Sequence, residues 1–190
     1  MKVGLFFGSF NPVHTGHLII ANYIAENTPL DRVWLVVSPQ NPFKQKHTLL
    51  NEYDRLHLIR LAIEDNPNLR ASDIEFKLPK PSYTMDTLTH LKEKYPDTEF
   101  SLIMGSDNLA TLHRWKNYEL ILAQYPIYVY KRKDAEQNPY PTHSSIHLLD
   151  VPLLDISATF IREQLQQGHS VQYFLPDKVW QYVRDYNLYK

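Results

Sequence analysis

Two histidines close to the start of the chain could do phosphate chemistry. His14 and His17 lie in residues 8–17, which read GSFNPVHTGH. Imidazole rings are strong hydrogen-bond donors and can carry positive charge, so a pair of them suits the stabilisation of charge on a phosphoryl group in transfer. A zinc site is a weaker interpretation, because no third ligand is evident nearby in the sequence. A β-turn with ordinary surface or capping histidines would explain either residue alone, but for the whole string we favour the functional interpretation.

The elements around this string would aim it at a ligand. Residues 3–7 are apolar and predict a buried strand, and residues 18–25 predict a helix. A turn between the two directs backbone N–H groups and the positive end of the helix dipole at one point, where many nucleotide enzymes bind a phosphate. Gly8 and Gly16 suit such a turn because, without Cβ atoms, they permit a sharp bend and a close approach to the ligand. The spacing matches neither a P-loop nor a dinucleotide fingerprint.

A second candidate stretch lies near the other end of the chain, at residues 156–162, which read ISATFIR. At a helix start, hydroxyls and free N–H groups, with Arg162 roughly one turn on, can hold the terminal phosphates of a nucleoside triphosphate, since guanidinium binds phosphate oxygens in pairs. An ordinary N-cap followed by a surface arginine explains this stretch equally well when it is taken alone. Lys44, in the proline-containing loop 38–47, could also contact phosphates, although an exposed lysine is more often simply solvated.

Strands and helices alternate along the chain. We expect strands at residues 3–7, 32–37, 70–76, 99–104, 126–130 and 146–149. We expect helices at 18–25, from about Asn51 to Glu64, after Ser82 as an N-cap, around 120–122, at 157–167 with Gly168 as the C′ residue, and at 176–186. This order predicts an α/β fold: a doubly wound, Rossmann-like parallel sheet with helices on both faces and a small C-terminal helical part. The ligand crevice should lie at the carboxyl ends of the strands.

Composition limits what the chain can be. Its 190 residues suffice for one well-buried domain, so we expect a single domain over residues 1–190. The net charge of −1 provides no basic face for a nucleic acid, and the longest basic run, residues 131–133, is expected to be a solvated loop. No cysteine is present, so we expect no disulfide and no thiolate metal site. Without a signal peptide or a stretch of transmembrane length, a cytoplasmic protein with no membrane partner is expected. The oligomeric state stays open.

Taken together, the two motifs resemble the signature of the nucleotidyltransferase superfamily, which pairs an H-x-G-H segment with an I-S-S-T-x-x-R segment. Members join a phosphate or phosphonate to a nucleoside monophosphate taken from ATP or CTP. The sequence departs from the pattern at Ala158, which lacks one hydroxyl, and at Asn11, where the family usually has Asp. Neither position is one to which we assign a phosphate contact.

The intervening segments resemble bacterial nicotinate-nucleotide adenylyltransferases. The similarity is carried by residues 81–88, by residues 105–109 followed by Trp115, and by the closing stretch 173–176. It implies transfer of the AMP part of ATP to nicotinate mononucleotide, giving deamido-NAD and pyrophosphate in NAD biosynthesis. Pantetheine-phosphate adenylyltransferase, or a nucleotide-binding regulatory module without catalysis, are the alternatives left open.

The resemblance also implies roles for individual residues. Trp115 would stack on the pyridine ring, although a core aromatic is as good an explanation of that residue alone. Backbone N–H groups near Thr84 and Lys116 would receive the carboxylate of the acceptor, beside Tyr83, and Asp107 would contact a ribose. Mg²⁺ would be held mainly by the phosphates of ATP. The predicted catalytic residues are His14, His17 and Arg162, and the predicted ATP-binding residues are Gly8, Ser9, Phe10, Gly16, Lys44, Ile156, Ser157, Thr159 and Arg162.

Overall fold

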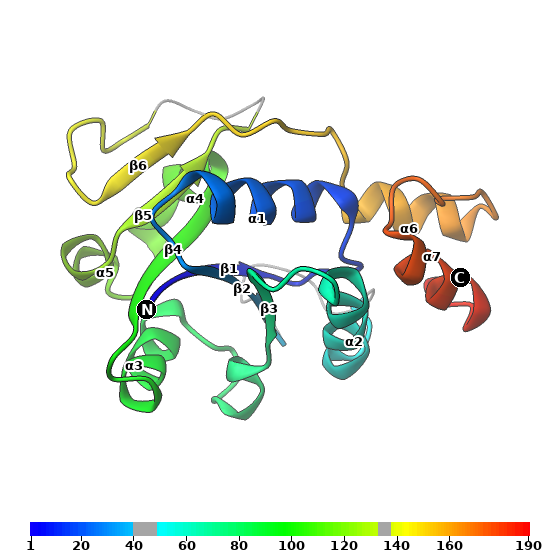
Figure 1. Ribbon diagram of the computed structural model, residues 1–190, viewed down its shortest axis with the longest axis horizontal. Coiled ribbons are helices and arrows are strands. Elements are labelled where there is room, and N and C mark those ends of the chain that lie inside the picture. The colour runs from blue at the N-terminus through cyan, green and yellow to red at the C-terminus, as the bar shows by residue number, and fades with distance from the viewer. Residues whose placement is uncertain (40–48, 133–137) are drawn as a thin grey trace.

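Six parallel strands form a sheet at the centre of the structure, a computed structural model that describes residues 1–39, 49–132 and 138–190 (Figure 1). The strands are β1 (Lys2–Gly8), β2 (Arg32–Val37), β3 (Leu69–Ser72), β4 (Glu99–Gly105), β5 (Ile127–Tyr130) and β6 (Ile146–Leu149). They lie in the order β3-β2-β1-β4-β5-β6, and every neighbouring pair is parallel. The predicted parallel sheet is confirmed. The strand order reverses between β1 and β4, which is where ligands bind in sheets of this class.

Helices cover both faces of the sheet. They are α1 (Thr15–Asn27), α2 (Glu52–Ile63), α3 (Thr84–Lys94), α4 (Ser106–Ala110), α5 (Tyr118–Gln124), α6 (Ala158–Gln166) and α7 (Asp177–Asp185), with the 3₁₀ helices η1 (Ile74–Lys77) and η2 (Leu112–Arg114). Figure 1 shows α6 and α7 beyond the end of α1 at which that helix begins, and they form the predicted C-terminal helical part. Within the described ranges, no helix is long and apolar enough to span a membrane.

Each face of the sheet carries its own apolar core. Buried side chains of α1, α2, α6 and α7 pack on one face, and those of α3, α4 and α5 pack on the other. Successive strand residues point to opposite faces, so Leu5 belongs to one core and Phe6 to the other. Because such strands are buried on both sides, they appear in the sequence as continuous apolar runs, which is why residues 3–7 and 32–37 predicted their strands correctly.

The predicted strand at residues 70–76 is wrong in its second half. β3 ends at Ser72, and η1 follows at Ile74–Lys77. β3 lies at the edge of the sheet and pairs with β2 alone, with Ser72 opposite Val36. Since β2 itself ends at Val37, no ladder remains to hold a strand through residue 76.

The predicted N-cap of the third helix is also wrong. α3 begins at Thr84 with Tyr83 as its N-cap, and the Ser82 hydroxyl instead donates to Oε2 of Glu75 at 2.9 Å. Ser82 thus lies one residue before the N-cap, and its hydroxyl is held by the carboxylate through a charge-assisted hydrogen bond. The C-terminal end of α6 follows the prediction, because Gly168 has a φ of +77° and sits directly after the C-cap residue.

Candidate active site

The two histidines lie together where α1 begins. His14 is the N-cap of α1, its side chain is buried, and its ring stacks on the ring of His17 with centroids 3.7 Å apart. The backbone N–H of His14 donates to Nδ1 of His17 at 3.3 Å. With Nδ1 acting as an acceptor, the proton of the His17 imidazole is assigned to Nε2. The ring donor of His17 is therefore Nε2, at the start of the helix.

The charge state of His14 follows from its surroundings. Burial, and then the positive charge of Arg132, lower the pKa of His14 from 6.5 to about 4. Its imidazole is consequently neutral at pH 7 in this state of the protein. Of the two properties expected from the sequence, a cation or a strong donor, His14 keeps the donor role until an anion arrives.

The glycines of the motif leave space for neighbouring side chains. A Cβ on Gly8 would lie 2.9 Å from the ring of Phe10, and a Cβ on Gly16 would lie 3.1 Å from Nδ1 of His14. The left-handed backbone of the turn is found at Phe10, with a φ of +45°, and not at a glycine. The two glycines thus make room for the Phe10 and His14 rings, a reason that the sequence did not disclose.

The buried Phe10 ring packs against the ring of His17. Its side chain is 1% exposed and packs edge-on against His17, with ring centroids 5.0 Å apart, and against Phe6 at 5.7 Å. The prediction that Phe10 binds ATP can hold only through its backbone, because the ring belongs to the core.

Arg162 connects the two predicted motifs. Its Nη1 donates to the backbone carbonyl of Asn11 at 2.7 Å, and its Nη2 lies 3.4 Å from the hydroxyl of Thr159. Ser157 is the N-cap of α6 and accepts a hydrogen bond from the N–H of Phe160 at 3.1 Å. The structure therefore contains the ordinary N-cap that the sequence allowed, and it also places the arginine against the loop that precedes the histidines.

The C-terminal part of the chain holds the start of α1 at two further points. The N–H and the hydroxyl of Thr15 both donate to the backbone carbonyl of Phe174, each at 3.0 Å. Ile156 approaches the same turn, since its Cβ would be 4.0 Å from a Cβ placed on Gly16. These contacts bring residues 8–17 and 156–162 to one edge of the sheet, as the paired motifs predicted.

Arg55 is a supporting residue that sequence reasoning missed. Its side chain is fully buried on α2 and donates to the backbone carbonyls of Ser9 at 2.5 Å, Ser38 at 3.0 Å and Leu50 at 2.9 Å. Ser9 follows β1 and Ser38 follows β2, so one guanidinium ties together the loops at the carboxyl ends of two neighbouring strands. An arginine on an amphipathic helix gives no sequence signal of such a role.

Arg132 is the second missed residue. It follows β5, its N–H donates to the Ser106 hydroxyl at 2.8 Å, and its Nε lies 3.6 Å from Oδ1 of Asp107. Its charge also lowers the pKa of His14, after the larger effect of burial. Residues 131–133 were expected to be a solvated loop; Lys131 and Arg132 do lie in an exposed loop, and Lys133 lies outside the described residues. What the sequence did not show is that Arg132 brings positive charge to His14 and pairs with the predicted ribose contact Asp107.

The residues predicted to bind the acceptor form a second group at the start of α3. Lys116 Nζ forms an ion pair with Asp86 at 3.0 Å and lies 5.0 Å from the centroid of the Tyr83 ring. Thr84 is the first residue of α3. Trp115 is half-buried and packs partly against the core on this face, so the core interpretation and the stacking interpretation each describe part of its surface.

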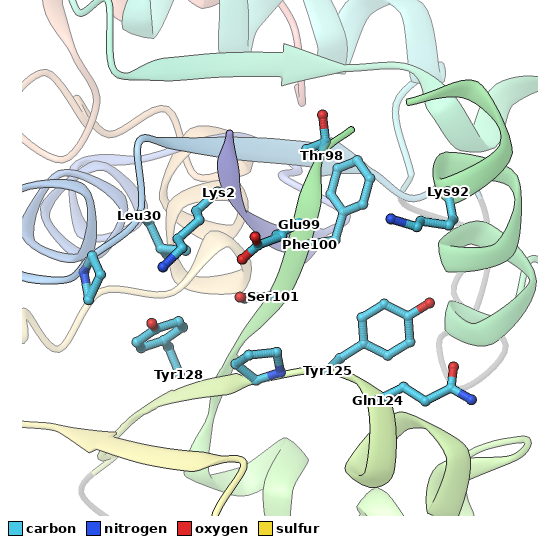
Figure 2. A pocket seen from close by; sticks show the side chains of 12 residues that line it. Lys2, Leu30, Lys92, Thr98, Glu99, Phe100, Ser101, Gln124, Tyr125 and Tyr128 are labelled. Atoms are coloured by element: carbon cyan, nitrogen blue, oxygen red, sulfur yellow. The ribbon is translucent and has the colours of Figure 1, made fainter. Parts of the chain in front are cut away.

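One cavity lies elsewhere. A space of about 440 Å³ opens at the amino ends of the strands, the opposite edge of the sheet from the histidines (Figure 2). Figure 2 shows Lys2 and Glu99, which begin β1 and β4, and Tyr128 of β5 around it. None of the predicted site residues lines this cavity. Lys44, the remaining predicted phosphate contact, lies outside the described residues.

Comparison with known proteins agrees with the geometry. Residues 5–164 match the model of the cytidylyltransferase-like family. Relatives from Flavobacterium psychrophilum and Flavobacterium johnsoniae, both described as probable nicotinate-nucleotide adenylyltransferases, are 57% and 55% identical, each over 100% of this chain and 100% of the relative. The chain belongs to the nicotinate-nucleotide adenylyltransferase family. A solved structure of the Plasmodium falciparum nicotinic acid mononucleotide adenylyltransferase complexed with NaAD has a TM-score of 0.84 at 19% identity, covering 99% of this chain and 97% of that one, and shows the same fold.

In this member of the nicotinate-nucleotide adenylyltransferase family, the two departures from the motif are accommodated locally. Oδ1 of Asn11 accepts a hydrogen bond from the N–H of Leu50 at 3.1 Å, a bond that a carboxylate oxygen would accept equally well. Ala158 is the first residue of α6, and the hydroxyls on either side of it, those of Ser157 and Thr159, have the partners described above. Asn11 and Ala158 therefore leave the contacts of Arg162 in place.

Proposed function

We propose that this protein transfers AMP from ATP to nicotinate mononucleotide, giving deamido-NAD and pyrophosphate, through the side chains grouped around His14 and Arg162. The observation that carries the proposal is the 2.7 Å bond from Arg162 to the Asn11 carbonyl, because it joins the two phosphate-binding motifs at the strand-order reversal. Family membership at up to 57% identity supports the same reaction. We further propose that residues 1–190 act as a single nucleotidyltransferase domain.

The reaction needs no nucleophile from the protein. An oxygen of the acceptor's 5′-phosphate attacks the α-phosphorus of ATP, a new P–O bond forms, and the bond from the α-phosphorus to the bridging oxygen breaks, so that pyrophosphate leaves with that electron pair. The protein must align the two phosphates and stabilise charge on the transferring and leaving groups. We assign the alignment to the positive dipole ends of α1 and α6, which both lie at this site.

The side chains then have separate tasks. The Nε2–H of His17 would donate to an oxygen of the transferring phosphate. His14 would donate in its neutral form, and a triphosphate beside it would favour its protonation, since an opposite charge raises the pKa of a base. Arg162 would bind the terminal phosphates while one of its nitrogens stays on the Asn11 carbonyl. Arg132, held by Asp107, adds positive charge near His14.

We propose that Mg²⁺ reaches the site on the phosphates of ATP. The donor set fits this arrangement, because the imidazole and guanidinium groups gathered at Asn11 and His14 complement phosphate oxygens. When bound, Mg²⁺ would neutralise charge on the triphosphate, and it commonly keeps several waters while substrate phosphates supply its remaining ligands. The chain's own contribution is the cationic and donor side chains that face the same phosphates.

The start of α3 would recognise the acceptor. Free N–H groups and the positive dipole end of a helix favour a carboxylate over an amide. The Tyr83 ring and Lys116 lie at this helix start, with Lys116 held by Asp86. Trp115 precedes Lys116 and offers the exposed part of its ring to a planar base. We therefore propose that nicotinate mononucleotide binds here by its carboxylate and its pyridine ring, with Asp107 near its ribose.

The test is pyrophosphate release from Mg-ATP with three acceptors: nicotinate mononucleotide, nicotinamide mononucleotide and 4′-phosphopantetheine. The amide of nicotinamide mononucleotide would turn its NH₂ donor toward a backbone N–H or leave that N–H unpaired. Such a mispaired contact costs roughly 1–3 kcal/mol, or about 5- to 150-fold in kcat/KM. We expect nicotinate mononucleotide to be preferred over the amide by at least that factor, and phosphopantetheine to be inactive. Equal kcat/KM for acid and amide would contradict recognition of the carboxylate. Activity with 4′-phosphopantetheine alone would show that the proposed acceptor is wrong.

A further inference from the structure

Glu75 is a buried carboxylate to which the roles above assign nothing. It lies on η1, between β3 and α3, and is 3% exposed. Its Oε2 accepts from the hydroxyl of Ser82 at 2.9 Å, and its Oε1 accepts from the hydroxyl of Thr87 at 2.8 Å. Each oxygen of the one carboxylate thus has a different partner.

The two partners flank the start of α3. Ser82 directly precedes the N-cap Tyr83, and Thr87 lies in the first turn of the helix. The Thr87 hydroxyl is also 3.3 Å from the Tyr83 carbonyl, which in turn accepts from the Thr87 N–H at 3.1 Å. Glu75 therefore holds the chain immediately before and immediately after the free N–H groups of this helix.

The burial of this carboxylate needs an explanation. Burial raises the pKa of Glu75, whereas the hydrogen bonds from Thr87, Ser82 and, at the end of β2, Ser38 act in the opposite direction. A carboxylate removed from water is unfavourable unless hydrogen bonds replace its hydration, and apolar residues of similar size would fill the same space at lower cost. A group retained under those conditions is best explained by what it holds in place, here the start of α3.

We propose that Glu75 is a positioning residue for acceptor recognition: through Ser82 and Thr87 it fixes the N–H groups at Tyr83 and Thr84 in the direction of the acceptor's carboxylate. It acts without touching the substrate. The inference rests on the proposed function, since it assumes that the acceptor binds at this helix start. Its consequence is that loss of Glu75 weakens binding of the acceptor, and weakens binding of the acid more than binding of the amide. The ATP half of the site on α1 and α6 keeps its geometry.

The principal variants are Glu75→Ala and Glu75→Gln. Alanine removes both acceptor oxygens. Glutamine keeps one, and its amide can donate to the other hydroxyl, which is able to accept, so most of the positioning should survive. Asp73→Ala and Asp73→Asn are the matched controls, because Asp73 is an exposed carboxylate two residues away, and its side chain does not cap η1.

Steady-state kinetics would measure KM for each substrate and kcat, with thermal unfolding alongside. A misplaced binding group can cost about 10- to 100-fold, so we expect Glu75→Ala to raise KM for nicotinate mononucleotide by about that factor and to reduce its preference over nicotinamide mononucleotide. KM for ATP should stay near wild type, Glu75→Gln should recover most of the loss, and both Asp73 variants should match wild type. The positioning role would be overturned if Glu75→Ala lowered the unfolding temperature but left the preference for acid over amide unchanged. It would also be overturned if KM rose equally for ATP and for nicotinate mononucleotide.

Two smaller changes serve if Glu75→Ala does not fold. Ser82→Ala and Thr87→Val each remove one hydrogen bond to Glu75 from the start of α3, and valine matches the shape of the buried threonine. Each should raise KM for nicotinate mononucleotide in part, and unchanged kinetics in both variants would contradict the inference. Failure of the proposed function is separately visible, because wild-type protein would then release no pyrophosphate with nicotinate mononucleotide.

Discussion

Burial of His14 makes the stability of the folded protein depend on pH in a window that can be calculated. The pKa of His14 is lowered from 6.5 to about 4, mainly by burial and then by the charge of Arg132. Between these values the unfolded chain binds a proton at this ring and the folded chain does not. Each unit of pKa difference corresponds to about 1.4 kcal/mol, so His14 alone accounts for a change of about 3 kcal/mol in the free energy of unfolding across the window.

The sign follows from the lowered pKa in the folded state. The contribution is fully present above about pH 6.5 and is lost as the pH falls toward 4, and roughly 2 kcal/mol of it is already lost at about pH 5. Urea unfolding of wild type, His14→Gln and His113→Gln at pH 7.5 and pH 5.0 would measure it. Glutamine does not titrate, so His14→Gln should lose about 2 kcal/mol less than wild type between the two conditions. His113 is exposed and serves as the control, so His113→Gln should follow wild type.

Comparing the pH-dependent losses, and not the absolute stabilities, removes the cost of deleting the buried ring itself. The remaining titratable groups are common to all three proteins and cancel in the comparison. A His14→Gln protein whose stability falls with pH as steeply as wild type would refute the reasoning. It would mean that the pKa of His14 does not differ between the folded and unfolded states in solution.

Three further changes address the site. His17→Ala should lower kcat by about 100- to 1000-fold with little change in ATP affinity, measured by steady-state kinetics and ATP titration, because its donor acts on charge that develops in the transition state; wild-type turnover in a folded variant would remove His17 from the mechanism. Arg162→Ala should mainly raise KM for ATP and weaken pyrophosphate inhibition, since its phosphates are present in the ground state; an effect on the acceptor alone would contradict its placement. Gly16→Ala should reduce activity more than stability, because its Cβ would lie 3.1 Å from the His14 ring and displace it; kinetics combined with thermal unfolding would show this, and unaltered kcat would mean that the ring accommodates the methyl group.

The apolar runs and the two short motifs carried most of the predictable information. Strands buried on both faces are continuous hydrophobic segments, so β1 and β2 were found with nearly correct bounds. Paired motifs with hydroxyl, guanidinium and imidazole groups likewise pointed to one phosphate site, and the contact between Arg162 and Asn11 brings the motifs together.

Two of the failures have the same cause, which is that a local sequence pattern does not show the partner that a side chain meets in the fold. Ser82 looked like an N-cap because hydroxyls at helix starts usually are, but Glu75 binds its hydroxyl. Arg55 was missed because a sequence window does not show the carbonyls that its buried guanidinium meets. Local patterns describe what a residue prefers, and only the tertiary arrangement decides which preference is satisfied.

The bond between Arg162 and Asn11 can form only late in translation of the chain. The histidine turn leaves the ribosome early, but its arginine is 151 residues further along the chain, and the Phe174 carbonyl that binds Thr15 is 159 residues further. At roughly 5–20 residues per second, translation of the interval takes about 8 to 30 s. Strands β2 to β6 are synthesised within that time, the last by residue 149, so every described strand exists before Arg162 can reach Asn11. A nascent chain, or one cut by a protease after β6, would therefore contain the six described strands and still lack Arg162, to which we assign the terminal phosphates of ATP.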